Sequence, residues 1–209
     1  IVLYTKGNKK LLNQNCIGIV GSRKATPYGL KVSDFFADRL SRAGLVIISG
    51  GARGIDTASH LAALKTDKTI CVLGCGIDIT YPRENKKLFE QIANHGLMVS
   101  EYPPTTPPIA TNFPARNRII AGIASGIILV EAAKKSGGLI TAEFAMDEGR
   151  EVYCVPGNIF SVNSAGVHSL LKQGAKLIDS PEDILEDFHL TLTTRENNQK
   201  YTMKNLFID

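Results

Sequence analysis

Residues 49–56 read Ser49-Gly50-Gly51-Ala52-Arg53-Gly54-Ile55-Asp56 and stand between two stretches of different periodicity. The preceding run Leu45-Val46-Ile47-Ile48 is wholly apolar, as in a buried strand, whereas the following residues have helical spacing. The glycines allow positive φ angles and leave room for a ligand, and the first amides of the helix point to the same place. The stretch therefore predicts a strand-to-helix turn that can bind an anion.

Two charged side chains belong to this turn. Arg53 can bind a phosphate group through two parallel hydrogen bonds, and Asp56 can either cap the helix or orient Arg53. The alternative is a tight turn whose arginine only faces solvent. The anion site is favoured because the same arrangement recurs along the chain.

The same order of strand, turn and helix occurs earlier in the chain. The apolar run Cys16–Val20 is followed by the turn Gly21-Ser22-Arg23-Lys24-Ala25. Thr26 and Pro27 then form the N-cap and first position of a helix that we expect to end at Gly44. Together with the next strand these residues make one βαβ unit.

Further apolar runs predict strands at residues 69–73, 97–100, 127–130, 151–155 and 176–178, each separated from the next by a helical segment. Glycines are expected to end four helices in the left-handed conformation, namely Gly44, Gly96, Gly149 and Gly174. Alternating strands and helices with right-handed crossovers build a sheet covered on both faces. We therefore predict an α/β fold with a doubly wound, mostly parallel sheet, an extended Rossmann-like fold.

The 209 residues suit one such domain, which we place at residues 16–188. Residues 1–15 are expected to form an N-terminal arm or edge strand, with the strand at Ile1–Tyr4. Residues 189–209 have no strong period and are interpreted as a C-terminal tail or linker. Because the chain begins with Ile rather than Met, we expect it to be part of a longer protein.

The composition gives few further constraints. The formal net charge of +4 mildly favours an anionic partner. The four cysteines have no metal-site spacing, and three of them stand in apolar runs, so we expect buried thiols and no metal. No apolar run has the length of a membrane span and no signal peptide opens the chain, so we expect a cytoplasmic protein.

The positions of the basic residues carry more information than the net charge. In doubly wound sheets, ligands bind at the carboxyl ends of the strands. Seven basic residues follow predicted strands and are expected along that rim: Arg23, Lys24, Arg53, Arg116, Arg118, Lys134 and Lys135. The turn Lys134–Gly138 is a further candidate phosphate cradle. Lys86 and Lys87 stand among acidic residues and are interpreted as part of a solvated helix face.

Several enzyme classes are disfavoured by missing motifs. The first turn has one glycine instead of G-x-G-x-x-G, and the second strand ends in Ser49 rather than an acidic residue, so NAD binding is not expected. The phosphate-binding loop of ATPases and the G-x-S-x-G elbow are absent. What remains is a cationic rim that suits a chain of phosphates, with four aromatic residues that either stack bases or belong to the core, Tyr28, Tyr81, Tyr102 and Phe113.

The sequence resembles a known family, the DNA-processing protein A family, also called DprA or Smf. The resemblance runs from about Tyr4 to Phe188. The matching stretches are Gly21-Ser22-Arg23, Ser49 to Asp56, Gly74-Cys75-Gly76-Ile77-Asp78, Tyr81-Pro82, Ser100 to Pro103, Phe113 to Arg118, Ser136 to Ala142, Gly149 to Val152, and Val155-Pro156-Gly157. In this order the short motifs are specific for the family.

The resemblance implies a non-enzymatic, cofactor-free protein that binds single-stranded DNA, forms a homodimer and helps to load the RecA recombinase during natural transformation. Arg23, Arg53 and Lys135 match motif positions that line the family's basic DNA pocket. The full set expected to bind DNA comprises Gly21, Ser22, Arg23, Lys24, Gly50, Gly51, Arg53, Gly54, Arg116, Arg118, Lys134, Lys135, Ser136, Gly137 and Gly138. The sequence departs from the family pattern at His168, where Asn is expected, and lacks the winged-helix domain that many members carry.

Two alternatives stay open at the level of sequence. The stretch Ser136–Glu143 also resembles the P-G-G-x-G-T-x-x-E motif of nucleotide phosphoribohydrolases, with Glu143 as a candidate general acid or base. It lacks the leading Pro and has Ile140 in place of the third Gly. The second alternative is an interaction scaffold whose affinity for DNA is incidental.

Overall fold

The computed structural model describes residues 1–192, which include one eight-stranded sheet in the order β1-β5-β4-β3-β2-β6-β7-β8. The strands are β1 (Tyr4–Gly7), β2 (Cys16–Val20), β3 (Val46–Ser49), β4 (Thr69–Leu73), β5 (Leu97–Ser100), β6 (Gly126–Leu129), β7 (Glu151–Cys154) and β8 (Lys176–Leu177). Strand β1 pairs with β5 in the antiparallel direction, and the other neighbours are parallel. The predicted doubly wound, mostly parallel α/β fold is confirmed.

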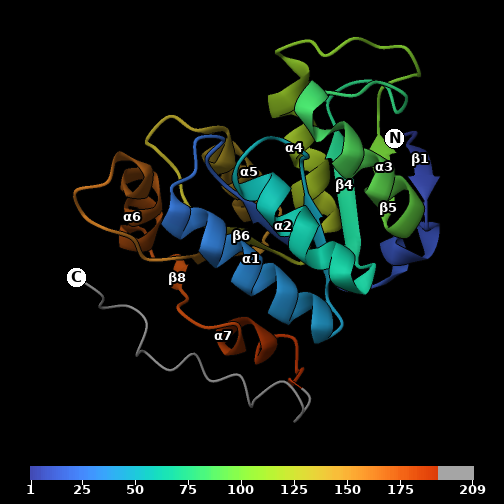
Figure 1. Ribbon diagram of the computed structural model, residues 1–209. Coiled ribbons are helices and arrows are strands. Elements are labelled where there is room, and N and C mark those ends of the chain that lie inside the picture. The colour runs from blue at the N-terminus through green and yellow to red at the C-terminus, as the bar shows by residue number, and fades with distance from the viewer. Residues whose placement is uncertain (193–209) are drawn as a thin grey trace.

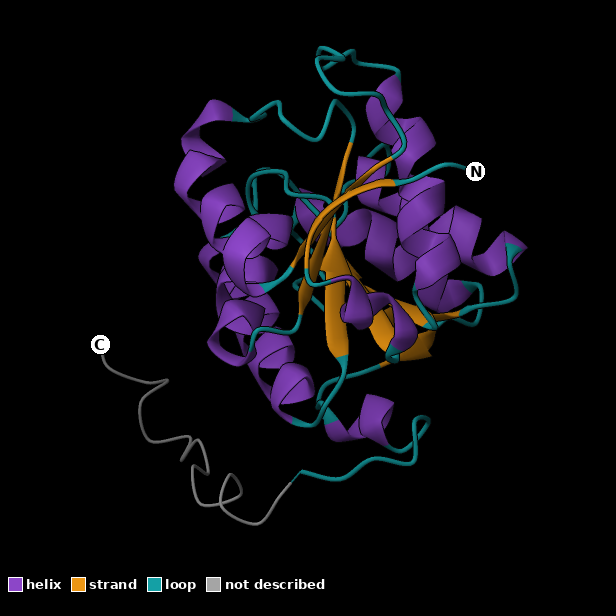
Figure 2. Cartoon of the chain, turned by 90° about the vertical axis from the view of Figure 1, so that its right-hand side faces the viewer, coloured by secondary structure: helices purple, strands orange, loops and turns teal. Residues whose placement is uncertain are grey.

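Helices cover both faces of this sheet (Figures 1 and 2). They are α1 (Pro27–Arg42), α2 (Ile55–Ala63), α3 (Lys86–His95), α4 (Asn112–Ile123), α5 (Gly137–Asp147), α6 (Ala165–Lys172) and α7 (Glu182–Leu185). Helices α1, α2, α3 and α7 supply core residues on one face, and α4, α5 and α6 supply them on the other. The turns that follow the carboxyl ends of the strands therefore lie together at one edge of the sheet, between the two layers of helices.

Strand β2 shows why the apolar runs are continuous. Ile17 and Ile19 join the core beneath α1 and α2, while Cys16 and Val20 join the core beneath α4 and α5, and all four are buried. A strand covered on both faces needs apolar side chains in both directions. Gly18 makes room for the neighbouring strand, since a Cβ there would lie 2.3 Å from Ile127 Cδ1.

The start of α1 is fixed to the end of β6. Thr26 Oγ1 accepts a hydrogen bond from the Gly29 amide at 3.1 Å, which is the predicted N-cap. The same hydroxyl donates to Glu131 Oε1 at 2.5 Å, and the Thr26 amide donates to Glu131 Oε2 at 2.9 Å. Because Glu131 is buried, this contact holds the β2–α1 turn against the neighbouring strand end.

Three of the four predicted helix-ending glycines have the expected left-handed conformation. The φ angles of Gly44, Gly149 and Gly174 are 106°, 65° and 98°. The prediction is wrong for Gly96, whose φ is −133°. Here glycine serves a close approach instead, because a Cβ would lie 2.5 Å from the Thr69 carbonyl oxygen.

The N-terminal strand is also shifted from its predicted place. It spans Tyr4–Gly7 rather than the apolar run Ile1–Tyr4, so the strand includes the polar residues Thr5 and Lys6. Pairing explains the shift: β1 aligns Tyr4 with Ser100 and Gly7 with Leu97, and only the edge position tolerates such polar residues. The proposed tail at 189–209 lies mostly outside the described residues.

The four cysteines are buried and unpaired. Burial raises the pKa of the Cys71 and Cys154 thiols to about 12 and the pKa of Cys16 and Cys75 to about 11. The described residues bring no three His, Cys, Asp or Glu side chains together as metal ligands. Among residues 1–192, no helix is both long and apolar enough to cross a membrane.

His60 is a buried polar residue that connects α2 to β4. Its side chain is fully buried, and its Nδ1 lies 2.7 Å from Thr69 Oγ1. Its Nε2 has no hydrogen-bond partner among the described residues. Burial, with a smaller contribution from the positive charge of Arg116, lowers the pKa of His60 to about 3, so the imidazole is neutral in the folded protein.

We predict that His60 makes the protein less stable in acid. The unfolded imidazole binds a proton near pH 6.5 and the folded one only near pH 3, so stability present above pH 6.5 is lost as the pH falls between these values. Between pH 7 and pH 4.5 the wild type should lose about 2 kcal/mol more unfolding free energy than His60→Leu. Urea unfolding at both pH values measures the difference. Parallel pH dependence of the two proteins would contradict a buried neutral imidazole.

Candidate functional site

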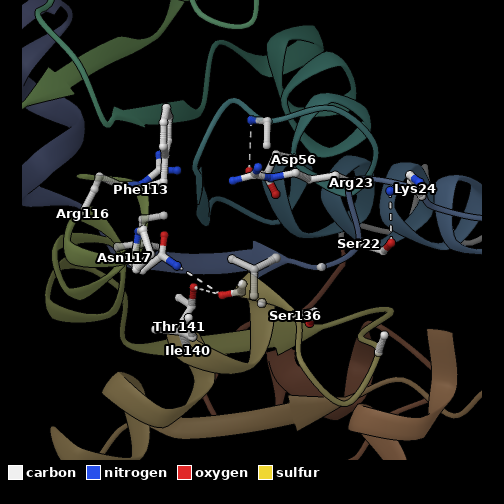
Figure 3. Close-up of a pocket in the computed structure, with 18 of the residues that line it drawn as sticks. Ser22, Arg23, Lys24, Asp56, Phe113, Arg116, Asn117, Ser136, Ile140 and Thr141 are labelled. Carbon is white, nitrogen blue, oxygen red and sulfur yellow. Dashed lines mark hydrogen bonds between the residues drawn. The ribbon is translucent and has the colours of Figure 1, made fainter. Parts of the chain in front are cut away.

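The turns at the carboxyl edge of the sheet enclose a groove made of two adjoining hollows, of which Figure 3 shows the first. The first has a volume of about 500 Å³ and the second about 270 Å³. The residues that line both hollows are Arg23, Lys24, Ala52, Phe113 and Arg116. The groove lies where ligands bind in doubly wound sheets, and we define it as the candidate site.

The first hollow is bounded by two glycine turns that approach each other closely. A Cβ on Gly138 would lie 3.2 Å from the Cα of Gly21, so a side chain here would push the turns apart. The N-terminus of α5 opens into this hollow, and Asn117 Nδ2 donates to the Gly137 carbonyl at 3.1 Å and holds it against α4. Free amides at a helix start favour an anion.

The second hollow has an aromatic wall. Phe113, which also lines the first hollow, lies with its ring centroid 5.3 Å from that of Tyr81, and the planes are tilted by 39°. Arg23 extends from the β2–α1 turn toward Phe113, and its guanidinium carbon is 5.7 Å from the ring centroid (Figure 3). Tyr81 is 44% exposed. These residues offer a flat apolar surface next to a positive charge.

The turn at residues 49–56 contributes less free hydrogen-bonding capacity than its sequence predicts. The Ala52 amide donates to Asp56 Oδ2 at 3.1 Å, and the Ile55 amide donates to the Ser22 carbonyl at 3.3 Å. Asp56 therefore fixes the turn and does not orient Arg53. Arg53 forms an exposed ion pair with Glu84 instead.

Arg116 lines the floor of both hollows, but its guanidinium is bonded to the protein itself. The residue is 4% exposed, and its Nη1 donates to the Gly50 carbonyl at 2.6 Å and also to the Val72 carbonyl. Burial raises the pKa of Asp56, and the nearby charge of Arg116 acts against that rise. Arg116 therefore connects α4 to the ends of β3 and β4, and we remove it from the residues proposed to contact a ligand.

The other predicted cations fall into two groups. Arg118 is paired with Glu101 at 2.5 Å, and Arg53 with Glu84. Four of the seven predicted rim cations are exposed and form no ion pair with the described residues: Arg23, Lys24, Lys134 and Lys135. Lys134 and Lys135 precede the groove residue Ser136 but do not line the hollows themselves. Thus Arg23 and Lys24 are the predicted cations that are both unpaired and in the groove.

The structure adds groove residues that the sequence did not single out. Asn117, Thr141 and Asn163 line the first hollow, and Asn163 Nδ2 donates to the Lys24 carbonyl at 3.0 Å. Asn117 stands within the motif at 113–118 and could have been selected there, whereas Asn163 is 139 positions from Lys24 and had no such signal. Asn117 and Thr141 come from α4 and α5 of one helical layer, and Asn163 comes from the segment before α6.

Two further expectations need correction. Lys86 and Lys87 are exposed on α3 as expected, but this solvated face is not far from the strand ends, because the preceding Asn85 donates to the Gly51 carbonyl at 3.0 Å. Glu143, the candidate acid or base of the phosphoribohydrolase alternative, is exposed and does not line either hollow. His168 at the departure from the family pattern lies 3.1 Å from the Gly157 carbonyl, so it fixes the local loop.

The fold and the groove define a Rossmann-like α/β protein with an open cationic site at the carboxyl edge of its sheet. The chain belongs to the DNA recombination-mediator protein A family, whose model matches residues 1–189. It is 47% identical to DNA processing protein DprA from Streptococcus pneumoniae over 189 residues, which cover 90% of this chain and 67% of that protein. The resemblance indicated by the motifs is confirmed.

Solved structures agree with this assignment. The structure of DprA from Streptococcus pneumoniae matches with a TM-score of 0.85 at 46% identity, over 88% of this chain and 65% of that one. DNA processing protein A from Helicobacter pylori, studied for its single-stranded DNA binding mode, matches with a TM-score of 0.84 at 33% identity, over 90% of this chain and 86% of that one. The chain also spans 66% of the length of DprA from Bacillus subtilis.

We predict that Arg116 is required for folding rather than for ligand contact. Arg116→Met leaves Asp56 and two carbonyl oxygens without their partner, and should lower the unfolding free energy by roughly 3–5 kcal/mol. The matched control is Arg118→Met on the same helix, which breaks a more exposed pair and should cost about 1 kcal/mol or less. Urea unfolding measures both. An Arg116→Met protein of normal stability that had lost ligand binding would contradict this assignment.

Proposed function

We propose that this chain binds single-stranded DNA in the groove without chemical turnover, and that it takes part in DNA recombination and natural transformation. The observation that carries the proposal is the position of Arg23 and Lys24, which form no ion pair with the described residues, beside the aromatic wall of the half-buried Phe113 and the exposed Tyr81. Cationic side chains follow a phosphate backbone, and aromatic rings stack unpaired bases. Membership of the family and the single-stranded DNA binding of the Helicobacter pylori relative support it.

The shape of the site favours a strand over a single nucleotide. Two hollows share the wall formed by Phe113, and the lysines 134 and 135 extend the positive charge beyond the first hollow. A mononucleotide uses one phosphate site, whereas a flexible single strand follows successive sites along a rim. Duplex DNA does not present its bases to the aromatic wall because they are stacked within the helix.

The proposal is of a binding protein and not an enzyme. The acidic residue that lines the groove is Asp56, which is 8% exposed and accepts the Ala52 amide. Glu143 lies outside the hollows, so the phosphoribohydrolase alternative has no acid or base beside the proposed ligand. Release of free base from nucleoside monophosphates by the purified protein, abolished by Glu143→Gln, would overturn the non-enzymatic proposal.

The remaining parts of the proposal rest on the family. A recombination mediator delivers a single strand to a recombinase, and we propose the RecA recombinase as the partner, with this protein acting as a homodimer in the cytoplasm. Mass measurement by light scattering tests the dimer. RecA filament assembly on strands coated by a single-stranded DNA-binding protein tests delivery, and an assembly rate unchanged by this chain would count against it.

We predict a preference for single strands over duplex DNA of the same length. The reason is that only unpaired bases can stack on Phe113 and Tyr81, each stack contributing about 1–3 kcal/mol. Fluorescence anisotropy at one fixed salt concentration measures both affinities. Equal affinities would favour the scaffold alternative, in which the binding of DNA is incidental and insensitive to strand form.

We also predict that individual groove cations control the affinity. Arg23→Ala should weaken binding to all sequences alike and lower the salt slope by roughly 0.7, the value for one phosphate contact on a single strand. A double change at Arg23 and Lys135 should weaken binding more than either single change. Binding titrations at several salt concentrations measure these effects.

The matched control for this prediction is the pair Lys9→Ala and Lys10→Ala. Both lysines are exposed and follow β1 at the opposite edge of the sheet, beside the amino end of β5. They carry the same formal charge as Arg23 and Lys135, but charges further away than a Debye length of about 8 Å are largely screened. If these controls weakened binding as much as the groove variants, the binding would be explained by diffuse attraction to the net charge and not by a site in the groove.

A further inference from the structure

The segment at residues 155–164, between β7 and α6, presents apolar side chains to solvent. Ile159, Phe160 and Val162 are 78%, 89% and 75% exposed. Among the large apolar residues in the described part of the chain, Ile1 alone is more exposed than Phe160. An apolar group this exposed adds nothing to the core, and a cluster of such groups indicates a binding surface.

The backbone that carries these side chains is held in place from several sides. Tyr28 Oη donates to the Pro156 carbonyl at 2.8 Å, and the Phe160 amide donates to Asn158 Oδ1 at 2.8 Å. At the far end, Asn163 bonds the Lys24 carbonyl through its side chain and accepts the Ala132 amide at 2.6 Å. The segment therefore presents Phe160 from a fixed backbone, which reduces the entropy lost when a ligand binds.

The segment adjoins the groove. Asn163 lines the first hollow, and its bond to the Lys24 carbonyl joins the segment to the turn that carries Arg23 and Lys24. The chain also contains no Asp or Glu between Val152 and Ile178. A polyanion that leaves the groove past Lys24 thus meets no negative side chain from this part of the chain.

We propose that the segment at 155–164 is an additional base-binding site, in which an unpaired base of a strand held in the groove stacks on Phe160. The inference rests on the proposed function and extends the proposed path of the DNA strand beyond the two hollows. Ile159 and Val162, exposed in the same segment, add apolar surface close to Phe160 in sequence. An aromatic ring that is 89% exposed, in a segment that is bonded to the Lys24 carbonyl and has no acidic residues of its own, suits a nucleobase attached to a phosphate backbone.

The test uses a series of oligothymidylates from about 4 to about 30 nucleotides, the range around the strand length that one small domain covers. Phe160→Ala should bind the shortest binding oligomer like the wild type and should bind the longer ones about 5-fold more weakly, the lower end for one lost base stack. Phe160→Tyr should bind all lengths like the wild type, and Phe160→Leu should resemble Phe160→Ala. A 2-aminopurine moved along the strand should show quenching at one position that Phe160→Ala abolishes.

The control is Leu61→Ala, which removes a side chain that is 50% exposed on α2 and lies outside both hollows. It should leave the affinity unchanged at every length. If Arg23→Ala weakens binding while Phe160→Ala matches the wild type at all lengths, the additional site is wrong and the groove stands. A change in molecular mass caused by Phe160→Ala, without a length-dependent loss, assigns the segment to contact between copies and overturns the inference. Absence of single-strand binding by the wild type overturns both proposals.

Discussion

The groove depends on a buried guanidinium. Arg116 reaches from α4 on one face of the sheet to the carbonyl oxygens of Gly50 and Val72 at the ends of β3 and β4, close to Asp56 of α2 on the other face. A Cβ on Gly50 would lie 2.6 Å from Arg116 Nη2, so glycine is required for this approach. One side chain thus joins both helical layers and two strand ends, and it fixes the floor of the groove.

Fixed and free polar groups have separate tasks at the carboxyl edge of the sheet. Glu131 and Asp56 accept backbone amides, and the turns they hold have little freedom to rearrange. Arg23 and Lys24 stand on one of these rigid turns with their charges free. A site of this kind recognises a ligand whose charge repeats along its length, because the turns define spacing and the long side chains adapt to it.

The sequence predicted local order well because each strand and helix is encoded by neighbouring residues. The runs at 69–73 and 97–100 match β4 and β5, and Thr26 caps α1 as expected. The individual roles at the site were harder to predict because they depend on distant partners. The pairing of Arg53 with Glu84 and the burial of Arg116 arise from contacts across the fold, which periodicity and spacing do not report.

The ion pair between Arg53 and Glu84 has a consequence for how the protein discriminates among anions. A phosphate that approaches Arg53 meets a carboxylate already in place and must exchange with it. In the proposed function, a phosphate bound by Arg53 still releases its condensed cation, but the contact must also displace the Glu84 carboxylate and so gains less free energy than a contact at an unpaired arginine. A short anion that reaches Arg53 alone therefore competes poorly with Glu84, whereas a long strand held at Arg23 as well, as proposed, would compete at high local concentration.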